Sequence, residues 1–389
     1  LRTPGHLAER LLNIYFRYLI QQGKYRYTQL QTVAFLNTQP VPELFPAFTE
    51  RNVAIALSAN DYYVPYVSAL LQSLKEHLNP SRNYDILIMT RDISLVNQKH
   101  LNAVLSDRKN TTLRFIDVSR FEKQFENLFV KGHFVLETYF RLLMPELMKN
   151  YEKVLYLDSD LILNADPAEL YDTDVTGYLL AATHDADTAG LYNGFEPNKK
   201  YYMDNVLKIE KPYSYFQAGV ILFNLVEFRK SYTTEEMLRF AASNRWELLD
   251  QDVLNYLAQG RYKAVDMAWN VMTDWRRIRI PEIIARGPKY LYDEYMAAYA
   301  APKIIHYAGP DKPWQQPYAD YAEYFWKYAR MSNYYEVLMQ RLAIQTVFEN
   351  RVPSLKERLH NKIMDWLYRL FPEGTRRRTI MRKIKNRGK

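Results

Sequence analysis

Short apolar runs alternate with amphipathic segments through the first half of the chain. Four short segments rich in apolar residues are predicted to be strands: 53–57, which is nearly continuous in apolar residues, 84–89, 113–118 and 154–157. Three segments repeat apolar residues at helical spacing: 64–77, 95–106 and 136–148. Strands that alternate with helices in this way predict right-handed βαβ units and a parallel, doubly wound sheet, so the predicted fold class is α/β.

The remaining segments set the predicted domain limits. Further short strands are expected at 178–182, 220–223 and 303–306, and further helices at 234–243 and 251–259. Helical spacing also marks the N-terminal part, up to a proline-bearing linker, and returns after residue 321. We therefore predict four parts: a helical extension at 1–50, an α/β domain at 51–318, a helical subdomain at 319–371 and a basic tail at 372–389.

The composition excludes several kinds of site. The chain has no cysteine, which excludes disulfides, a thiol nucleophile and zinc sites built on thiolates. No apolar run approaches the roughly 18 residues of a membrane-spanning helix. The loop after residue 57 lacks the G-x-G-x-x-G and GK[ST] patterns that cradle phosphates. If a nucleotide binds here, we expect a divalent cation to neutralise its phosphates.

Positive charge gathers near the C-terminal end. Residues 351–389 contain 13 Lys or Arg and three acids, whereas the rest of the chain has a slight acidic excess. This distribution argues against a uniformly basic nucleic-acid-binding body and favours a basic tail that meets an anionic membrane surface. Four apolar residues just before the tail suit insertion in a membrane interface: Trp366, Leu367, Leu370 and Phe371. A solvated tail without a partner is the alternative.

The Asp-x-Asp spacing occurs four times, so the spacing alone carries little information. Asp158-Ser159-Asp160 differs from the others because it lies between the apolar runs VLYL and LIL. Carboxylates close to a core must be paired or bound to a metal. Alternate residues that leave a strand in a turn can direct both carboxylates at one cation, and hard oxygen ligands favour Mg²⁺ or Mn²⁺.

His306 also ends an apolar run, in the sequence IIHYAGPDKPW. A histidine before a turn is often a hydrogen-bonded core residue, and that interpretation stays open. The Gly, Pro, Lys and Trp that follow are the residues expected of a loop that closes over an anion. We therefore expect His306 to be a third metal ligand, with Lys312 on a phosphate. An imidazole ligand favours Mn²⁺ over Mg²⁺.

Four motifs follow one another along the chain: VLYLDSDLIL, YFQAGVILFNL, DQDVLN and HYAGPDKPW. In this order they resemble glycosyltransferase family 8, over about residues 53 to 315. That family includes bacterial lipopolysaccharide α-galactosyltransferases, α-glucosyltransferases and glycogenin. The resemblance implies a GT-A fold, which is a Rossmann-like nucleotide-sugar-binding domain. It also implies a UDP-sugar donor, Mn²⁺ and retention of the anomeric configuration.

The resemblance implies roles for particular residues. Asp158, Asp160 and His306 match the metal ligands, and Gly309 and Lys312 match a loop that contacts the diphosphate. Further donor contacts are implied for Ser58, Asn60 and Tyr63 at uracil and ribose, for Arg141 and Ser159 near the sugar and phosphates, and for Gln217 and Ala218 at the sugar. Two of these depart from the commoner family pattern, since Asn60 stands where an acid is frequent and Gln217 where Asn is frequent.

Three residues are the implied catalytic candidates. Asp250 and Gln251 match residues beside the anomeric carbon, and Asp185 matches a further acid of the sugar site. An amide is a poor nucleophile, so we expect front-face internal return, in which the departing phosphate deprotonates the acceptor hydroxyl. His133 lies in a segment that the family uses to close over the site.

The sequence thus predicts a retaining hexosyltransferase that moves galactose or glucose from a UDP-sugar to a glycan, glycolipid or glycoprotein acceptor. One alternative is a non-catalytic nucleotide-sugar- or glycan-binding module of the same fold. Another is a protein that binds nucleic acid through its tail, although no nucleic-acid partner is expected. The opening residues lack a secretory signal pattern, so we expect a cytoplasmic protein, peripheral at the inner face of a bacterial cell membrane.

Overall fold

The computed structural model describes residues 43–126, 128–130 and 136–349, together with a few positions between 11 and 23. The chain divides into two units, Leu1–Glu43 and Leu44–Lys389, and the fold below belongs to the second. Several predicted features lie outside the described residues: most of the helical extension, His133, the helices expected beyond residue 350 and the basic tail. Within the described part, no helix is both long enough and apolar enough to span a membrane.

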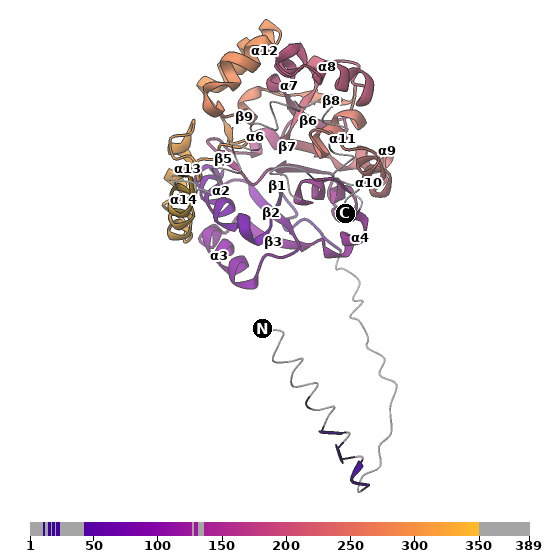
Figure 1. The fold of residues 1–389 in the computed structure, drawn as a ribbon, viewed down its shortest axis with the longest axis vertical. Helices are drawn as coiled ribbons and strands as arrows, with labels where there is room; N and C mark the ends of the chain where they lie inside the picture. The colour runs from indigo at the N-terminus through magenta and orange to yellow at the C-terminus, as the bar shows by residue number, and fades with distance from the viewer. Residues whose placement is uncertain are drawn as a thin grey trace, which may run out of the picture. The chain divides into compact units, whose positions relative to one another are not determined.

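Two sheets lie at the centre of the second unit (Figure 1). The larger sheet contains β1 (Asn52–Ser58), β2 (Asn83–Thr90), β3 (Thr111–Asp117), β4 (Lys153–Leu157), β6 (Leu180–His184), β7 (Phe216–Asn224) and β8 (Tyr262–Ala264). Their order across the sheet is β3-β2-β1-β4-β7-β6-β8. The smaller sheet contains β5 (Leu161–Leu163), β9 (Val271–Met272) and β10 (Ile304–His306), in the order β5-β10-β9.

The first four strands lie where the apolar runs predicted them, to within two residues at each end. In β1 and β2 every residue except the first is buried. Strands that are covered on both faces need apolar residues at nearly every position, which is why these runs do not alternate with polar residues. β1 pairs in parallel with β2 and β4, and β2 pairs in parallel with β3, as expected of βαβ units.

The predicted parallel pairing does not extend to β7, which pairs antiparallel with both β4 and β6. β6 ends at His184, and this residue pairs with Phe216 at the start of β7. The chain between the two strands therefore leaves and re-enters the sheet at the same edge. A connection that does not cross to the opposite edge must produce an antiparallel neighbour.

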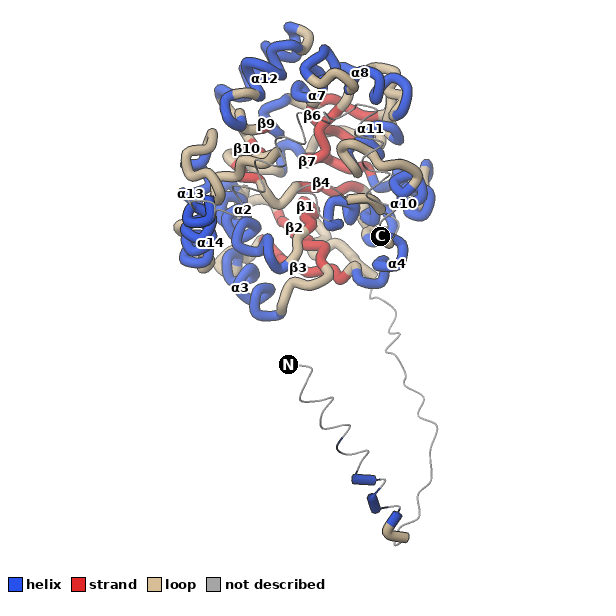
Figure 2. Tube along the Cα trace, in the orientation of Figure 1, coloured by secondary structure: helices blue, strands red, loops and turns tan. Residues whose placement is uncertain are grey.

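Helices cover both faces of the larger sheet (Figure 2). The described α-helices are α2 (Val64–His77), α3 (Leu95–Leu105), α4 (Glu122–Phe125), α5 (Met144–Leu147), α6 (Ala168–Tyr171), α7 (Ala186–Gly190), α8 (Lys199–Tyr201), α9 (Leu225–Ser231), α10 (Thr234–Ala242), α11 (Asp250–Leu257), α12 (Lys289–Ala300), α13 (Ala322–Ala329) and α14 (Tyr335–Glu349). The helix expected at 136–148 is instead a 3₁₀ helix, Leu136–Leu143, followed by α5. Pro145 in the first turn of α5 lacks an N–H, so one continuous α-helix is disfavoured there.

The C-terminal helices share a core with the α/β domain. One buried cluster joins α13 to both strands β5 and β10, and it includes Ile162, Ile305, Trp314, Phe325 and Tyr328. The Ser332 hydroxyl donates a buried hydrogen bond of 2.8 Å to Ser68 of α2. The described part of the predicted helical subdomain, residues 319–349, therefore packs against α2 and the smaller sheet.

Candidate active site

The predicted site residues, although far apart in the sequence, line one cavity of about 420 Å³. The cavity includes the C-terminal ends of β1 and β10 and the turns after β4 and β6, the edge where ligands of open α/β sheets bind. The fifteen residues predicted as metal ligands, donor contacts or catalytic groups all line it: Ser58, Asn60, Tyr63, Arg141, Asp158, Ser159, Asp160, Asp185, Gln217, Ala218, Asp250, Gln251, His306, Gly309 and Lys312.

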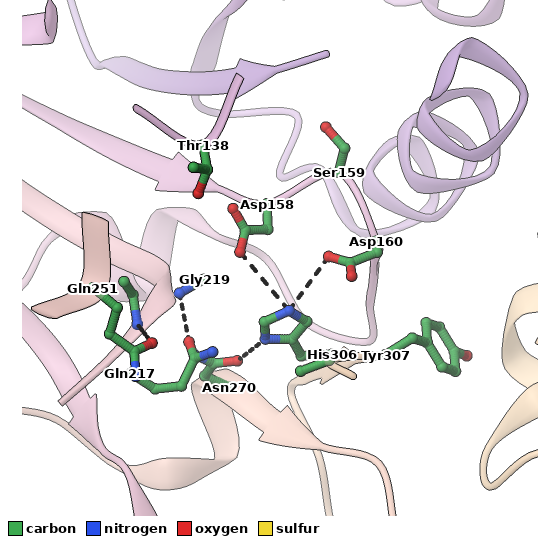
Figure 3. A network of polar contacts seen from close by, with 12 residues as sticks. Thr138, Asp158, Ser159, Asp160, Gln217, Gly219, Gln251, Asn270, His306 and Tyr307 are labelled. Carbon is green, nitrogen blue, oxygen red and sulfur yellow. Dashed lines mark hydrogen bonds and ion pairs between the residues drawn. The ribbon is translucent and has the colours of Figure 1, made fainter. Parts of the chain in front are cut away.

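Asp158, Asp160 and His306 come together in this cavity (Figure 3). His306 Nε2 lies 3.3 Å from Asp160 Oδ1 and 3.8 Å from Asp158 Oδ2. One ligand atom from each of the three residues lies within 4.8 Å of the others. The strand pairing explains this proximity, because β5 runs antiparallel to β10 and pairs Leu161 with His306. The turn that carries the two aspartates is thereby held beside the histidine at the end of β10.

The surroundings of His306 suit a metal ligand. Its Nδ1 lies 2.9 Å from Asn270 Oδ1, and a proton on Nδ1 donated to that oxygen leaves the Nε2 lone pair facing the two carboxylates. A Cβ added to Gly219 would lie 2.3 Å from His306 Cε1, so the glycine leaves room for the ring. Two carboxylates and one imidazole are a donor set for Mn²⁺ or Mg²⁺, and the residues fit a divalent cation.

Lys312 places a positive charge beside the aspartates. Its Nζ lies 2.5 Å from Asp160 Oδ2 and donates a hydrogen bond of 2.6 Å to Tyr307 O. Burial opposes ionisation of Asp160, but the charge of Lys312, together with the neighbouring His306, outweighs burial and holds the pKa of Asp160 well below its usual range. In the same loop Gly309 has a φ of +104°, a backbone conformation in which a side chain would be strained.

Arg141 is a buried cation, with only 4% of its side chain exposed. Its Nη2 lies 2.7 Å from Asp158 Oδ1, its Nε lies 2.9 Å from Asp250 Oδ2, and its guanidinium lies over the ring of Tyr156. Burial disfavours the charged form, but Asp158 and Asp250 raise the pKa of Arg141 above its usual value. One arginine therefore links a metal-ligand candidate to the acid at the start of α11.

Asp250 is almost completely buried. Burial raises the pKa of Asp250 to about 6, despite Arg141 and a hydrogen bond that the Thr138 hydroxyl donates to Oδ1. The residue before it, Leu249, has a φ of +50°, which is rare for a bulky side chain. Such a conformation costs about 1–3 kcal/mol and persists only where the surrounding structure imposes it. Here the strained residue immediately precedes the acid that pairs with Arg141.

Gln251 is held at both ends of its side-chain amide. Its Nε2 donates to Asp185 Oδ2 at 2.9 Å, and its Oε1 accepts from Ala218 N at 2.9 Å. The other oxygen of Asp185 accepts from Thr188 N at 2.8 Å and so caps α7. The orientation of Gln251 in the cavity is therefore fixed by β7 and by the turn that begins α7.

The loop after β1 is also tied into the site. Asn60 Oδ1 accepts a hydrogen bond of 3.2 Å from Tyr63 N, which caps the short 3₁₀ helix Asp61–Tyr63. Ser159 Oγ donates a hydrogen bond of 2.6 Å to Ser58 O. The predicted nucleotide loop and the aspartate turn are therefore directly connected.

The sequence analysis missed several residues in and around the cavity, above all Asn270, which contacts His306. Its Oδ1 faces His306 Nδ1, and its Nδ2 donates to Gln217 Oε1 at 2.5 Å, so it orients a metal-ligand candidate and a predicted sugar contact together (Figure 3). It lies in the short 3₁₀ turn Met267–Asn270, where no motif marks it. The lining residues that were not predicted include Thr138, Asp187 and Arg279.

Comparison with known proteins gives the class to which this fold and site belong. The model of glycosyl transferase family 8 matches residues 54–317. The chain therefore belongs to glycosyltransferase family 8: it is an enzyme, a glycosyltransferase, with the GT-A fold. The predicted family and fold class are confirmed.

Individual relatives are distant in sequence. General stress protein A of Bacillus subtilis (strain 168) is 26% identical over 290 residues, which cover 70% of this chain and 91% of that protein. The solved structure of the WbbM bifunctional glycosyltransferase has a TM-score of 0.70 at 30% identity; the match covers 87% of this chain and 60% of the WbbM chain. The structure of galactosyltransferase LgtC was solved with donor and acceptor sugar analogues, and it shares the fold, with a TM-score of 0.59 at 24% identity. The match covers 72% of this chain and 96% of LgtC.

Proposed function

We propose that this glycosyltransferase moves galactose or glucose from a UDP-sugar to a glycan, glycolipid or glycoprotein acceptor, with retention of configuration and with Mn²⁺. The observation that carries the proposal is the grouping of Asp158, Asp160 and His306 beside Lys312 in one cavity. A cation held there, together with the lysine, suits a diphosphate that has no glycine-rich cradle.

In this proposal Asp158, Asp160 and His306 hold Mn²⁺, which when bound supplies positive charge that stabilises the diphosphate as a leaving group. Lys312 exchanges its contact with Asp160 for one with a phosphate oxygen. Gly309 allows the backbone of the same loop to approach the diphosphate. The chain's contribution at this end of the donor is charge and position.

The uridine and the sugar occupy neighbouring parts of the cavity in this proposal. Ser58, Asn60 and Tyr63 contact the uridine, with the tyrosine ring against the base. Gln217 and Ala218 contact the sugar from the first residues of β7. Gln217 is available in a fixed orientation, because its Oε1 accepts hydrogen bonds from both Asn270 and the backbone of β7.

The transfer step is proposed to take place between Asp185, Asp250 and Gln251. Asp250 accepts hydrogen bonds from sugar hydroxyls, and Gln251 lies beside the anomeric carbon. Because an amide is a poor nucleophile, we favour front-face internal return. The bond from the anomeric carbon to the diphosphate oxygen breaks, the acceptor oxygen bonds to the same face, and the departing phosphate takes the acceptor's proton. The configuration at the anomeric carbon is thereby retained.

Turnover of UDP-galactose and UDP-glucose with and without Mn²⁺ tests the proposal. We expect Mn²⁺-dependent release of UDP from at least one donor. Asp158→Asn and Asp160→Asn should each lose about 100-fold or more of this turnover while the protein stays folded. Asp293→Asn, which affects an exposed residue paired with Lys289 on α12, is the matched control. Full turnover in both site variants, or no metal-dependent release from either donor, would contradict the proposal.

Asn60 and Gln217 differ from the commoner family pattern, which is why a non-catalytic binding module was kept as an alternative. The family assignment favours an enzyme over such a module. Calorimetry combined with turnover separates the two. A binding module would bind UDP in the presence of Mn²⁺ and release no product, whereas the proposed transferase does both.

A further inference from the structure

Two charged residues of the cavity, Asp187 and Arg279, have no role in the function proposed so far. Asp187 lies in the first turn of α7, two residues after Asp185. Arg279 follows β9 in the segment Arg279–Ile283. The side chain of Arg279 is 4% exposed and that of Asp187 is 20% exposed. Both are therefore largely removed from solvent, and the hydrogen bonds that they make become important.

The carboxylate of Asp187 is incompletely bonded. Its Oδ1 is buried and has no hydrogen-bond partner among the described residues, and neither has the Nε of Arg279. Asp187 Oδ2 lies 3.5 Å from that Nε, which is an ion pair but too long for a strong hydrogen bond. Asp185 differs, because both of its oxygens accept hydrogen bonds, from Thr188 N and from Gln251 Nε2.

Arg279 cannot easily move closer to complete these bonds. Its Nη1 donates to Thr273 O and its Nη2 donates to Ala308 O at 3.0 Å, so two backbone carbonyls fix the guanidinium. Helix α7 cannot move toward it either, because a Cβ added to Gly190 would lie only 1.9 Å from Ile283 O. The backbones of the two segments are already in close contact, so the missing hydrogen bond of Asp187 follows from the packing.

A carboxylate that lines a cavity and has fewer hydrogen-bond donors than its oxygens can accept is suited to a hydroxyl group. Burial raises the pKa of Asp187 to about 6, with Arg279 acting in the opposite direction, so the group is mainly ionised at neutral pH and can only accept hydrogen bonds. A buried carboxylate without enough donors is costly, and a hydroxyl that donates to it removes part of that cost. Sugar hydroxyls are the donors that the proposed substrates bring into this cavity.

We propose that Asp187 is a specificity-determining residue that accepts a hydrogen bond from a hydroxyl of a hexose bound in the cavity, and that Arg279 is its positioning residue. This hexose belongs either to the donor or to the acceptor, because both carry hydroxyl groups that can donate a hydrogen bond. The inference rests on the proposed function. The inference adds to that function a residue that selects among sugars by the arrangement of their hydroxyl groups.

The test compares Asp187→Asn and Asp187→Ala with wild type and with the control Asp293→Asn. Three quantities are measured: the ratio of the Kd values of UDP and UDP-hexose, the KM for hydrolysis of the UDP-hexose, and the KM for transfer to methyl hexosides. Each donor and each hexoside is used in its galactose and its glucose form. A charged hydrogen bond is worth about a tenfold to hundredfold change in one of these quantities.

The pattern of changes identifies the sugar. If Asp187 contacts the donor hexose, the Kd of the UDP-hexose and the hydrolysis KM rise while the Kd of UDP itself is unchanged. If it contacts the acceptor, the KM for the hexoside rises and donor hydrolysis is unchanged. In either case galactose and glucose should be affected unequally. Wild-type values in all three measurements, in variants whose melting temperatures show that they are folded, would overturn the inference.

Arg279→Lys tests the positioning role, because it keeps the charge and loses the planar fork that binds two carbonyls. We expect the same KM as in Asp187→Asn to rise, by a smaller factor, with kcat much less affected. The double variant should be no worse than Asp187→Asn alone, since the two residues act as one unit. Additive effects would show that Arg279 acts independently. Absence of all turnover in the wild-type enzyme would contradict the proposed function instead, which keeps the two failures distinct.

Discussion

Gly219 is a residue of the site at which no side chain fits without displacing its neighbours. A Cβ there would lie 2.3 Å from Cε1 and 2.7 Å from Nδ1 of His306, and 3.0 Å from Asp158 Oδ2. Gly219 stands inside β7, and the neighbouring strands β4 and β6 restrict movement of its backbone. We expect Gly219→Ala to displace the histidine and to weaken Mn²⁺ binding about tenfold to hundredfold, as measured by calorimetry. A folded variant with wild-type Mn²⁺ affinity would show that this contact does not position His306.

Asp250 couples stability to pH in the direction opposite to an ordinary salt-bridged acid. Its folded pKa of about 6 exceeds the usual 3.8, so the protonated form is the favoured one in the folded state. The facing charges act in opposite senses, since Arg141 lowers this pKa and Asp158 raises it. Protonated Asp250 therefore contributes to the stability of the folded protein in full below pH 3.8, and this contribution is lost as the pH rises through 6.

The variant Asp250→Asn mimics the protonated form at every pH. We expect it to be more stable than wild type at neutral pH by about 3 kcal/mol, since one pKa unit corresponds to about 1.4 kcal/mol. At about pH 4 the difference should nearly vanish. Turnover should fall at both pH values, because the carboxylate that pairs with Arg141 is lost. Denaturant unfolding at the two pH values checks this, and a difference in stability that does not depend on pH would contradict it.

The positions of the site residues that the sequence suggested have a common cause. Asp158, Asp160 and His306 each follow or end an apolar run, so the pattern already suggests that they lie at the edge of a sheet. Asn270 and Asp187 have no such signal. Asn270 faces His306 because β9 pairs with β10, and Asp187 is left partly unbonded because of how α7 packs. Such relations exist only between segments that the fold brings together, so the sequence pattern cannot show them.

At the level of elements, the apolar runs predicted the first strands but not the direction of β7. Direction depends on the edge at which the chain re-enters the sheet, and hydrophobicity does not encode it. It matters for the site, because β7 begins at the edge that carries the cavity and so places Gln217 and Gly219 there. A strand running parallel to its neighbours would place its first residues at the opposite edge.

Helix α14 supports two loops of the candidate site. Arg341 donates to Tyr62 O at 2.8 Å and to the Tyr66 hydroxyl at 3.1 Å, and its guanidinium lies 4.0 Å from the centre of the Tyr62 ring. Tyr66 in turn stacks on Trp314, with ring centres 4.1 Å apart. Trp314 follows Lys312 by two residues. The helix therefore contacts the loop after β1 directly and the lysine loop through one pair of rings.

We expect Arg341→Ala to raise the Kd of UDP roughly fivefold in the presence of Mn²⁺, since one cation–π contact and its hydrogen bonds are lost. The affinity for Mn²⁺ alone should stay unchanged, because the three candidate ligands lie on other elements. Calorimetry measures both. Arg330→Ala, at an exposed arginine where α13 ends, is the matched control. Equal UDP affinities in the two variants would show that α14 does not support the nucleotide loop.

Over the whole molecule, positive charge is unevenly distributed along the sequence. The acids that line the cavity include Asp158, Asp160, Asp185, Asp187 and Asp250, whereas 13 of the 52 Lys and Arg lie within residues 351–389. In the proposed function the diphosphate is neutralised inside the cavity, so the basic residues of 351–389 are not needed for the nucleotide. We propose instead that they bind an anionic membrane surface, where a lipid-linked acceptor would be found.

This proposal predicts a binding that depends on lipid charge. Replacing Arg376, Arg377 and Arg378 by Gln should weaken sedimentation with phosphatidylserine-containing vesicles about 100-fold, because each basic residue near such a surface contributes about 1 kcal/mol. Vesicles of phosphatidylcholine alone should bind neither protein, and added salt should release the wild type. Release of UDP from a UDP-hexose in solution should be the same in both proteins, because the cavity is unchanged. Vesicle binding that survives the replacement, or binding of RNA or DNA at salt concentrations that abolish vesicle binding, would mean that the tail serves another partner.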